Sequence, residues 1–460
     1  MQNTDHHNDH YDTVIVGAGF AGLTAARELA DAGQRVLVIE GRDRTGGRTW
    51  TDDRLGLDLE MGGTWVHWTQ PYVWRELAHY GIGTVKSPDI DRAVWFDESG
   101  RRESGIGELF AELDPACSAF GADARTYFPH GFDPFTNPAA GSLDHLTVDD
   151  RIAQLDLTPT QQELLRSFWA LNFNGRTDQA AYTQALRWLA STNGDWQVML
   201  EACTTYKVKG GMKALTDAIH NDAMSRGAEF RFGERVLGID SADNGATVVT
   251  DSGQHDTDRV VVTVPLHVLG NIRFTGDLGT LGGTVDRAVQ RGQVGRGTKV
   301  WVTITSETEP FLALGRPDWP ITMMQGEYPV DGGVVAVCFG SDATTFNISD
   351  RDAVTEAVRR IIPDAKIGEF AAHDWVTDEF AGETWPMHAP GYFNESLPVL
   401  VQGTDRIRFA GSDYATGWGG FVDGAVESAI QQSRRIIDEV AESAADTPAA
   451  DRIPVAGGQS

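Results

Sequence analysis

The first forty residues combine apolar runs with a glycine-rich turn. An apolar run at 12–16 precedes Gly17, Gly19 and Gly22, and a second apolar run at 35–39 ends in an acid, Glu40. This order predicts a β-strand, a tight turn, a helix and a second β-strand. The unit is typical of a chain that binds an adenine dinucleotide.

Later segments repeat this alternation in a looser form. Helical periodicity is visible near 161–172 and 180–190, and a turn at 208–211 leads into a third helix. Residues 296–375 are rich in strands, and no internal repeat is visible. Further elements are expected as strands at 229–232, 235–241, 247–250 and 259–265, a buried strand at 406–413 and a final helix at 422–440.

The glycine turn carries the first chemical signal. Gly17 permits the tight turn, Gly19 lets a pyrophosphate approach the backbone, and Gly22 lets the helix pack on the strand. The N-terminus of the helix supplies free N–H groups and partial positive charge for the phosphates. The carboxylate of Glu40 is placed to accept hydrogen bonds from ribose hydroxyls.

A second glycine pair decides which dinucleotide is expected. Gly46 and Gly47 precede Arg48, and a further pair, Gly62 and Gly63, follows soon after. A nicotinamide enzyme has no need of these, whereas a flavin reaches deeper into the protein. Glycines allow close backbone approach, and an arginine fork can neutralise pyrophosphate charge. The chain therefore resembles the flavin-dependent amine oxidases, the family of monoamine oxidases and bacterial nicotine-pathway oxidases.

The resemblance implies an α/β fold of two interleaved domains. A Rossmann-like FAD-binding domain is expected from residues 11–85, 207–294 and 376–440, and an α+β substrate domain from 86–206 and 295–375. This is the two-domain arrangement of amine oxidases and of glutathione reductase. Residues 1–10 and 441–460 are expected to be disordered tails, because they are polar or rich in Ala, Asp, Pro and Gly.

Residues 406–424 resemble the C-terminal half of the flavin site. Gly411 and Gly420 permit close backbone approach, Asp413 can accept hydrogen bonds from ribityl hydroxyls, and the helix after Phe421 directs its positive end at the cofactor. The predicted FAD-binding residues are Gly17, Gly19, Phe20, Ala21, Gly22, Glu40, Gly41, Arg42, Gly47, Arg48, Gly62, Gly63, Thr64, Trp65, Val236, Trp375, Gly411, Ser412, Asp413, Gly420, Phe421 and Val422.

Lys299 is the single residue with the sharpest predicted role. It opens the apolar strand 299–304, where a lysine is costly unless it is solvated or partnered. The family places a lysine after such a turn, where it holds a water at flavin N5. Its ammonium favours the superoxide-like charge that develops when O2 reoxidises the flavin. The alternative is a strand-edge lysine that extends to solvent.

Three further positions correspond to family residues that contact the flavin or the amine. Thr384 stands where monoamine oxidases carry the cysteine that is linked to flavin, so the FAD is expected to be noncovalent. Trp385 and Phe421 are expected to form an aromatic pair perpendicular to the ring. Such a slot excludes water, which favours the neutral amine, and attracts residual positive charge. Either aromatic alone is also consistent with a core residue.

The helix at 161–172 resembles a segment that supplies a substrate-facing asparagine in 6-hydroxynicotine oxidases. Asn172 is therefore a candidate polar contact and Phe339 a candidate wall, although packing alone could bury either of them. His67 and Trp68 are also candidates to face the cavity. No Ser/His/Asp arrangement is evident.

Composition narrows the class of protein and its partners. The formal charge is −28 over 460 residues, which argues against binding to nucleic acid or to an anionic membrane. The three widely spaced cysteines suggest neither a disulfide framework nor a metal site. No signal peptide or membrane span is visible, so a cytoplasmic location is expected. The oligomeric state is open, with a homodimer as one option.

The sequence thus predicts an FAD-dependent amine oxidase. A small primary or secondary amine would be oxidised at its α-carbon to an imine that hydrolyses to a carbonyl, with O2 reduced to H2O2. Two alternatives stay open, namely a dehydrogenase of the same fold that passes electrons to another acceptor and a flavoprotein binding module without turnover. The sequence does not identify the amine, which is either a secondary methylamino compound or a primary monoamine.

Overall fold

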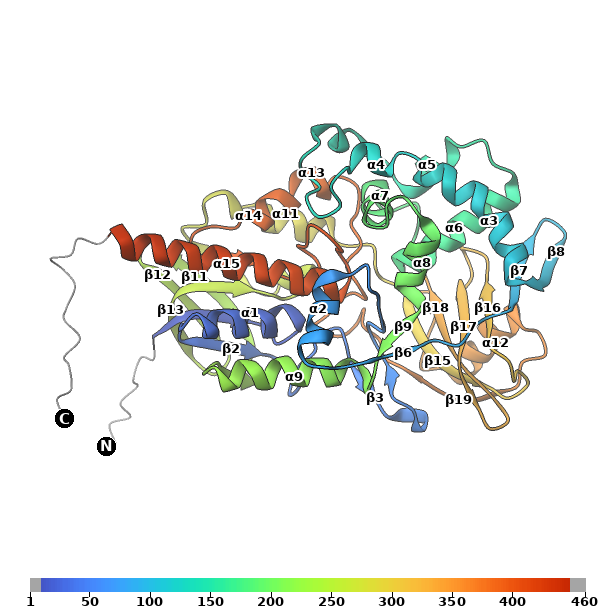
Figure 1. Ribbon diagram of the computed structural model, residues 1–460, viewed down its shortest axis with the longest axis horizontal. Helices are drawn as coiled ribbons and strands as arrows, with labels where there is room; N and C mark the ends of the chain where they lie inside the picture. The colour runs from blue at the N-terminus through green and yellow to red at the C-terminus, as the bar shows by residue number, and fades with distance from the viewer. Residues whose placement is uncertain (1–9, 447–460) are drawn as a thin grey trace.

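Two large β-sheets organise the chain in the computed structural model, which describes residues 10–446 (Figure 1). The first sheet has the order β10-β2-β1-β13-β12-β11-β14, with β20 paired to β13. It lies in the left half of Figure 1. Its strands are β1 (Tyr11–Val16), β2 (Val36–Glu40), β10 (Glu229–Phe232), β11 (Val236–Ala242), β12 (Gly245–Thr250), β13 (Gln254–Val262), β14 (Arg273–Gly276) and β20 (Ile407–Phe409).

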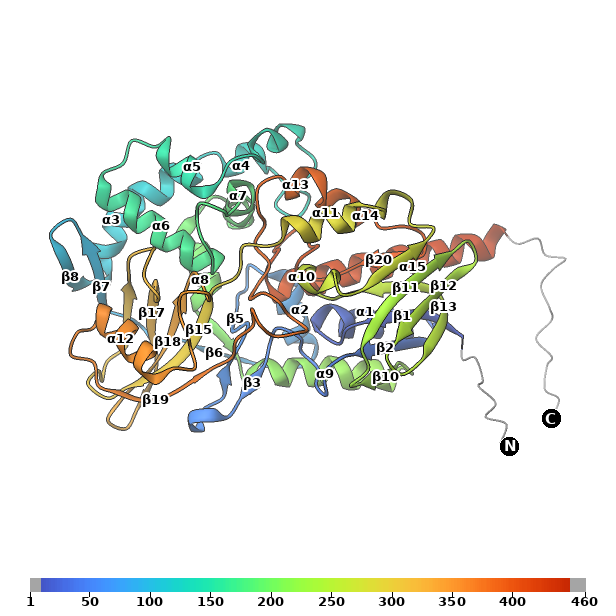
Figure 2. The same cartoon turned by 180° about the vertical axis from the view of Figure 1, so that it is seen from behind.

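The parallel part of the first sheet carries three helices on one face. Strands β10, β2, β1, β13 and β20 run parallel to one another, whereas β12 pairs antiparallel with β13. Buried side chains of this face, such as Ile15 and Val38, pack against apolar residues of the helices, such as Leu23 and Val426. The helices are α1 (Phe20–Asp31), α9 (Gly211–Ser225) and α15 (Val422–Asp446), which lie side by side in Figures 1 and 2.

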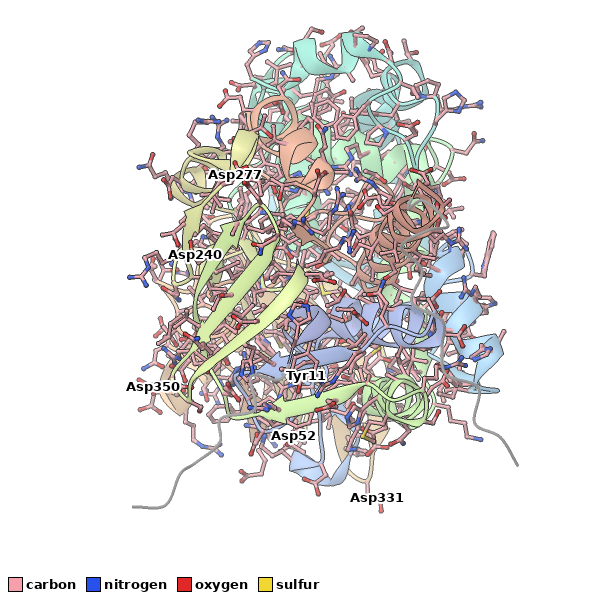
Figure 3. All side chains as sticks on the ribbon, turned by 90° about the vertical axis from the view of Figure 1, so that its left-hand side faces the viewer. Tyr11, Asp52, Asp240, Asp277, Asp331 and Asp350 are labelled. Atoms are coloured by element: carbon pink, nitrogen blue, oxygen red, sulfur yellow. The ribbon has the colours of Figure 1, made fainter. Side chains whose placement is uncertain are left out.

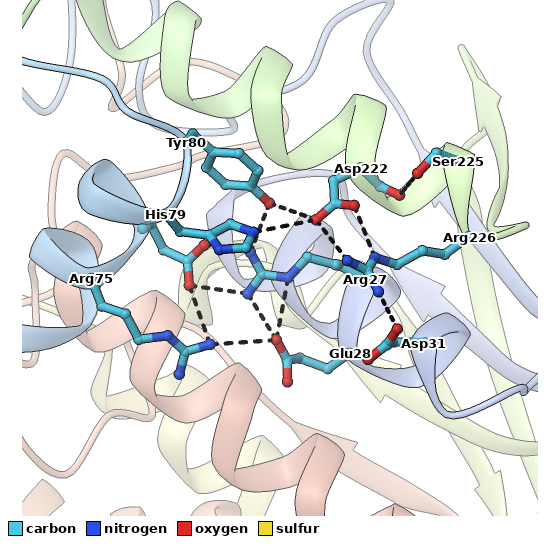
Figure 4. A network of polar contacts seen from close by, with 10 residues as sticks. Arg27, Glu28, Asp31, Arg75, His79, Tyr80, Asp222, Ser225 and Arg226 are labelled. Atoms are coloured by element: carbon cyan, nitrogen blue, oxygen red, sulfur yellow. Dashed lines mark hydrogen bonds and ion pairs between the residues drawn. The ribbon is translucent and has the colours of Figure 1, made fainter.

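A polar cluster fastens α1 to α2 (Pro71–His79) and to α9 (Figure 4). The guanidinium of Arg27 is buried and contacts the carboxylate of Glu76 and, at 2.8 Å, the hydroxyl of Tyr80. Tyr80 in turn donates to Asp222 of α9 at 3.0 Å, and Asp222 also accepts from Arg226. Each buried charge therefore has a partner, which offsets its loss of hydration.

The second sheet, in the right half of Figure 1, has the order β19-β15-β18-β17-β16-β7-β8. Its side chains alternate between two faces. Val300, Ala336 and Cys338 pack toward α12 (Arg351–Ile361), whereas Trp301 and Phe339 point the other way. The strands are β7 (Arg92–Asp97), β8 (Gly100–Gly105), β15 (Thr298–Ile304), β16 (Phe311–Leu314), β17 (Met323–Val330), β18 (Gly333–Gly340) and β19 (Ile367–Ala372).

A group of helices lies above the second sheet (Figures 1 and 2). These helices are α3 (Ile106–Gly121), α4 (Ala124–Tyr127), α5 (Val148–Ala153), α6 (Pro159–Phe173), α7 (Tyr182–Ser191) and α8 (Trp196–Thr204). Helix α6 begins with a capping box between Thr158 and Gln161, with Pro159 in its first turn, and it ends at Asn174 in the left-handed conformation. These signals fix both ends of the helix that carries Asn172.

Smaller elements connect the two large sheets. A three-stranded sheet has the order β5-β9-β6, and a two-stranded sheet pairs β3 with β4. These and the remaining short elements are β3 (Thr51–Asp52), β4 (Leu59–Glu60), β5 (Trp65–Val66), β6 (Thr84–Lys86), β9 (Tyr206–Val208), α10 (Leu266–Leu269), α11 (Thr284–Arg291), α13 (Tyr392–Glu395) and α14 (Leu397–Gln402), with short 3-10 turns at Arg54–Gly56, Pro138–Leu143 and Gly279–Leu281.

The predicted α/β fold is confirmed, with differences in detail. Every strand of the first sheet lies within the segments expected to bind the dinucleotide, and every strand of the second lies within the expected substrate segments. The domain boundaries themselves stay a prediction. Strand β13 begins at Gln254 rather than at 259, because its polar first half pairs with β12. Strand β20 ends at Phe409 rather than at 413, before Gly411 turns the chain at φ 154°.

The last helix extends to Asp446, so residues 441–446 are helical rather than part of a disordered tail. Alanine and glutamate in this stretch favour the helix. At the other end, His10 is exposed and pairs with Asp258. The remainder of both predicted tails, 1–9 and 447–460, lies outside the described residues.

Acidic side chains are distributed over many elements of the surface. Figure 3 labels Asp240, Asp277, Asp331 and Asp350, all of them exposed, together with the half-buried Asp52. Among residues 10–446, no group of three or more His, Cys, Asp or Glu side chains is arranged to hold a metal ion. In the same range, no helix is long and apolar enough to cross a membrane.

Candidate flavin and amine site

One cavity is lined by residues of both large sheets. One of its walls is formed at the carboxyl ends of parallel strands, where Gly17 follows β1, Glu40 ends β2 and Gly411 follows β20. Its other wall comes from the second sheet, through Lys299 of β15 and Phe339 of β18. Ligands of open parallel sheets bind at such an edge.

Nearly all of the predicted site residues line this cavity. They include the predicted amine contacts Asn172, Phe339, Trp385 and Phe421 as well as Lys299. The lining FAD candidates are Gly17, Gly19, Phe20, Ala21, Glu40, Gly41, Arg42, Gly47, Arg48, Gly62, Gly63, Thr64, Trp65, Val236, Trp375, Gly411, Ser412, Gly420, Phe421 and Val422. Gly22 and Asp413 do not line it.

The glycine loops face one another across the dinucleotide end. Gly17 has φ 105° and Gly47 has φ 58°, conformations that other residues rarely adopt. A Cβ atom on Gly47 would lie 3.3 Å from the Cα of Gly19, so the two loops are close together. Gly22 serves packing instead, because a Cβ there would lie 1.9 Å from the carbonyl oxygen of Gly17.

The start of α1 is suited to an anionic group. Gly19 is its N-cap and no side chain caps it, so the first N–H groups of the helix are left to a ligand. Gly19, Phe20 and Ala21 all line the cavity. Glu40 accepts from the backbone N–H of Ala18 at 2.7 Å and of Arg42 at 2.8 Å. Burial raises the pKa of Glu40, and these two donors partly counteract it.

Arg48 lines the cavity and is held by buried carboxylates, and its predicted role at a pyrophosphate stays a prediction. Its guanidinium donates to Glu383 at 2.7 Å, to the hydroxyl of Ser412 at 3.1 Å and to the carboxylate of Asp413. Burial raises the pKa of Asp413, but Arg48, Glu383 and the N–H of Leu266 together outweigh this effect and leave that pKa below its usual value. The charge of Arg48 is thus balanced within the protein before any pyrophosphate binds.

The predicted role of Asp413 as a ribityl acceptor stays a prediction. Its side chain is buried and outside the cavity lining, where it accepts from the N–H of Leu266 at 2.9 Å as well as from Arg48. Both acceptor oxygens are used inside the protein. Asp413 holds Arg48 and the turn before α10.

Glu383 completes this cluster, and the sequence did not single it out. It is fully buried, and its second oxygen lies 2.5 Å from Nδ1 of His267. Burial raises the pKa of Glu383 to about 7, and Asp413 adds to this effect. Two carboxylates thus surround one arginine, with His267 as a further partner. The only sequence signal is position, since Glu383 directly precedes Thr384.

Lys299 is buried against the cavity rather than extended to solvent. It is 4% exposed. Its ammonium donates to the carbonyl oxygens of Glu60 and Gly62, both at 2.7 Å, and to the hydroxyl of Thr64 at 2.5 Å. Burial lowers its pKa to about 7, although Glu60 and Glu327 act to raise it. The alternative of a solvent-reaching lysine is therefore wrong.

Aromatic side chains enclose the part of the cavity that lies beyond Lys299. The rings of Phe339 and Trp385 meet edge to face at 6.0 Å, and those of Trp65 and Phe339 lie 6.3 Å apart. Phe421 packs on Trp188 at 4.7 Å. Trp188 also lines the cavity, although the sequence did not single it out. It falls in a predicted helix, and its partner Phe421 is distant in the sequence.

Asn172 and Trp385 are joined directly. The indole N–H of Trp385 donates to the main-chain carbonyl of Asn172 at 2.9 Å. The amide nitrogen of Asn172 donates to the carbonyl of Phe168 at 2.7 Å, which leaves the side-chain oxygen as the acceptor available at the cavity. Thr384, beside Trp385, uses its hydroxyl to donate to Gly295 at 2.9 Å.

Two candidates from the sequence lie away from the cavity. The ring of His67 is buried, with Nδ1 2.9 Å from the hydroxyl of Thr69, and Trp68 is 57% exposed. Neither is part of the lining. Other lining residues that sequence reasoning did not name include Leu171, Cys203, Thr204 and Met323.

The residues at the two ends of the cavity fit one extended cofactor with a substrate beyond it. Uncapped helix N–H groups, side-chain-free glycine loops and a buried acid at Glu40 suit an adenine dinucleotide. The second glycine loop extends the cavity toward the substrate sheet. There Trp65, Phe339, Trp385 and Phe421 line a part of it that we call the aromatic compartment. Fold and site together define a flavoprotein of the two-domain type.

Comparison with known proteins identifies the family. The model of the flavin containing amine oxidoreductases matches residues 20–437. The chain belongs to this family, and its cofactor is a flavin.

Among its relatives, the nicotine dehydrogenase of Pseudomonas putida (strain DSM 28022 / S16) is 33% identical over 93% of this chain and 88% of that protein. A pseudooxynicotine dehydrogenase from a Pseudomonas species is 32% identical over 92% of this chain and 85% of that protein. A solved structure of putrescine oxidase with bound putrescine has a TM-score of 0.80 at 22% identity and covers 94% of this chain and 99% of that one.

Proposed function

We propose that the protein is an FAD-dependent amine oxidase. It converts a small primary or secondary amine, at its α-carbon, to an imine that water hydrolyses to a carbonyl compound. The amine loses two electrons and two protons, and O2 gains them to give H2O2. When bound, FAD supplies this two-electron chemistry between the amine and O2. The observation that carries the proposal is the aromatic compartment that adjoins a buried lysine on the substrate side of the cavity.

The compartment favours a neutral amine. Trp65, Phe339, Trp385 and Phe421 offer apolar faces, and withdrawal of water lowers the pKa of an ammonium group. A neutral amine keeps its nitrogen lone pair for the reaction. The side-chain oxygen of Asn172 can accept a hydrogen bond from the amine N–H and thereby orient the α-carbon.

The distribution of charge supports a monoamine over a diamine. Among the described lining residues the acidic ones are Glu40, Glu234 and Glu379. Glu234 lies beside Glu40, because its N–H donates to the carbonyl of Glu40 at 3.1 Å, and Glu379 contacts Arg235. All three belong to the dinucleotide end. A second ammonium group would therefore lack a carboxylate partner in the aromatic compartment.

The acceptor is the part of the proposal that needs the most direct test. In favour of O2, the ammonium of Lys299 is buried at the cavity, where a cation stabilises developing negative charge. The names of two relatives, which are dehydrogenases, favour the alternative of a different electron acceptor. Lys299 and the aromatic walls, all at one cavity, argue against a binding module without turnover.

An oxygen electrode with coupled peroxide detection tests the proposal. Aromatic and aliphatic monoamines, secondary methylamines and putrescine are supplied in turn to the holoenzyme. We expect a monoamine to drive O2 uptake with one H2O2 formed per O2, and putrescine to be a poor substrate. Reduction of the flavin by amine without O2 uptake would contradict the oxidase assignment and support a dehydrogenase.

A further inference from the structure

A buried ion pair lies behind the aromatic compartment and outside the cavity lining. Glu327 of β17 is 1% exposed and Lys207 of β9 is 8% exposed, and their charged groups are in contact. The other carboxylate oxygen of Glu327 accepts from the amide of Gln325 at 2.7 Å. The ammonium of Lys207 also lies 4.0 Å from the centre of the ring of Tyr328. The pair joins the three-stranded sheet to the substrate sheet.

Ser87 connects this pair to the wall of the cavity. Its hydroxyl donates to Glu327 at 2.7 Å and accepts from the indole N–H of Trp65 at 3.2 Å. Ser87 is buried, so neither bond is exchanged freely with water. The hydroxyl is used once as a donor and once as an acceptor. Its direction is set by the carboxylate, which can only accept.

Trp65 is the end of this connection that touches the site. It lines the cavity, and its ring lies 5.7 Å from the ammonium of Lys299 and 6.3 Å from the ring of Phe339. Its strand β5 pairs with β9 in a register that places Trp65 opposite Lys207. Backbone pairing therefore holds the main chain of Trp65, whereas the hydrogen bond to Ser87 holds the orientation of its indole.

We propose that Ser87 is a positioning residue of the aromatic compartment, which is the amine compartment of the proposed function. The Lys207–Glu327 pair fixes Ser87 in place, and Ser87 in turn fixes the indole of Trp65. The inference rests on the proposed function, which assigns this compartment to the binding of the amine. It adds a specificity determinant that lies outside the cavity. The width of the compartment between Trp65 and Phe339 depends on a side chain that never touches the amine.

Fluorine NMR of the holoenzyme labelled with 5-fluorotryptophan tests the connection without any substrate. Trp65→Phe assigns the Trp65 resonance. Ser87→Ala removes the hydroxyl, and Ser87→Thr restores it. The matched control is Ser104→Ala, because Ser104 accepts the indole N–H of Trp95 at 3.0 Å in a similar bond and neither residue lines the cavity.

We expect the Trp65 resonance to shift or broaden in Ser87→Ala, to return toward the parent position in Ser87→Thr and to stay in place in Ser104→Ala. The amine concentration that gives half-maximal flavin reduction should rise about threefold to tenfold in Ser87→Ala. The limiting rate and the FAD content should change less. Ser104→Ala should leave all three values unchanged.

An unmoved Trp65 resonance in Ser87→Ala would overturn the inference, whatever the chemistry of the enzyme. A moved resonance with an unchanged amine concentration would overturn the positioning role and leave the proposed function intact. If no amine reduces the flavin of the parent enzyme, the proposed function fails and the role in an amine compartment fails with it. The fluorine spectra identify this case, because they report the Ser87–Trp65 bond independently.

Discussion

Replacement of Lys299 by methionine should slow the reaction with O2 while it leaves the fold and the FAD site nearly intact. The ammonium contacts three oxygens, none of which belongs to a carboxylate. Its loss leaves no carbonyl without a donor. The main-chain carbonyl of Glu60 still accepts from the indole N–H of Trp301 at 2.9 Å, and that of Gly62 still accepts from the hydroxyl of Thr64 at 3.1 Å. We therefore expect stability to change by about 1 kcal/mol.

The effect on the O2 step is expected to be larger. Loss of one preorganised group that stabilises developing negative charge typically costs about 2.7–4 kcal/mol, or about a hundredfold to a thousandfold in rate. The pKa of Lys299 is lowered to about 7 by burial. The ammonium is thus present below this pH and lost above it. The parent rate constant with O2 should fall as pH rises through about 7, and that of Lys299→Met should not.

Stopped-flow mixing measures this step by itself. Each holoenzyme is reduced photochemically without amine and then mixed with oxygenated buffer at several pH values. Lys209→Met is the matched control, because Lys209 is an exposed lysine outside the cavity. An O2 rate constant in Lys299→Met equal to that of the parent, with the same pH profile, would refute the reasoning and assign Lys299 a structural role.

Three further outcomes are expected. Acid should release intact FAD from the yellow protein, because Thr384 cannot form a thioether, and flavin that stays with the precipitate would contradict this. Trp385→Ala should retain FAD but slow anaerobic flavin reduction at saturating amine by about a hundredfold, since misplacement by ~1 Å is enough for that loss; reduction at the parent rate would place Trp385 outside the amine compartment. Glu383→Gln should weaken FAD binding, measured by flavin fluorescence on dilution, because the neutral amide loses the ion pair that orients the guanidinium of Arg48; unchanged affinity would show that Asp413 alone holds Arg48.

The local part of the fold was predictable because its signals are local. A strand, three glycines, a helix and an acid within thirty residues define the dinucleotide unit, and the structure assembles β1, α1 and β2 in that way. Helix α6 likewise follows its capping box and apolar periodicity, which places Asn172 at the cavity. The alternation of side chains along β15 places Lys299 on the same face as Trp301.

Interactions between distant segments were not predictable in the same way. Arg48 meets Glu383 and Asp413 more than 300 residues later in the chain, so no local pattern reveals that its charge is already balanced. Asp413 lies within a recognisable motif, yet its side chain turns inward to Arg48 and Leu266. Trp188 reaches the cavity only because α7 packs against the loop before Phe421, with its indole donating to Gly419 at 2.7 Å.

Anaerobic titration of the bound flavin with amines tests the central claim most directly. The panel contains primary monoamines, secondary methylamines and polyamines, and the yellow absorbance of the flavin is recorded before and after admission of O2. We predict that at least one monoamine bleaches the flavin completely, that polyamines do so poorly, and that O2 restores the colour with formation of H2O2. A flavin that no amine in the panel bleaches would contradict the assignment of this site to amine oxidation.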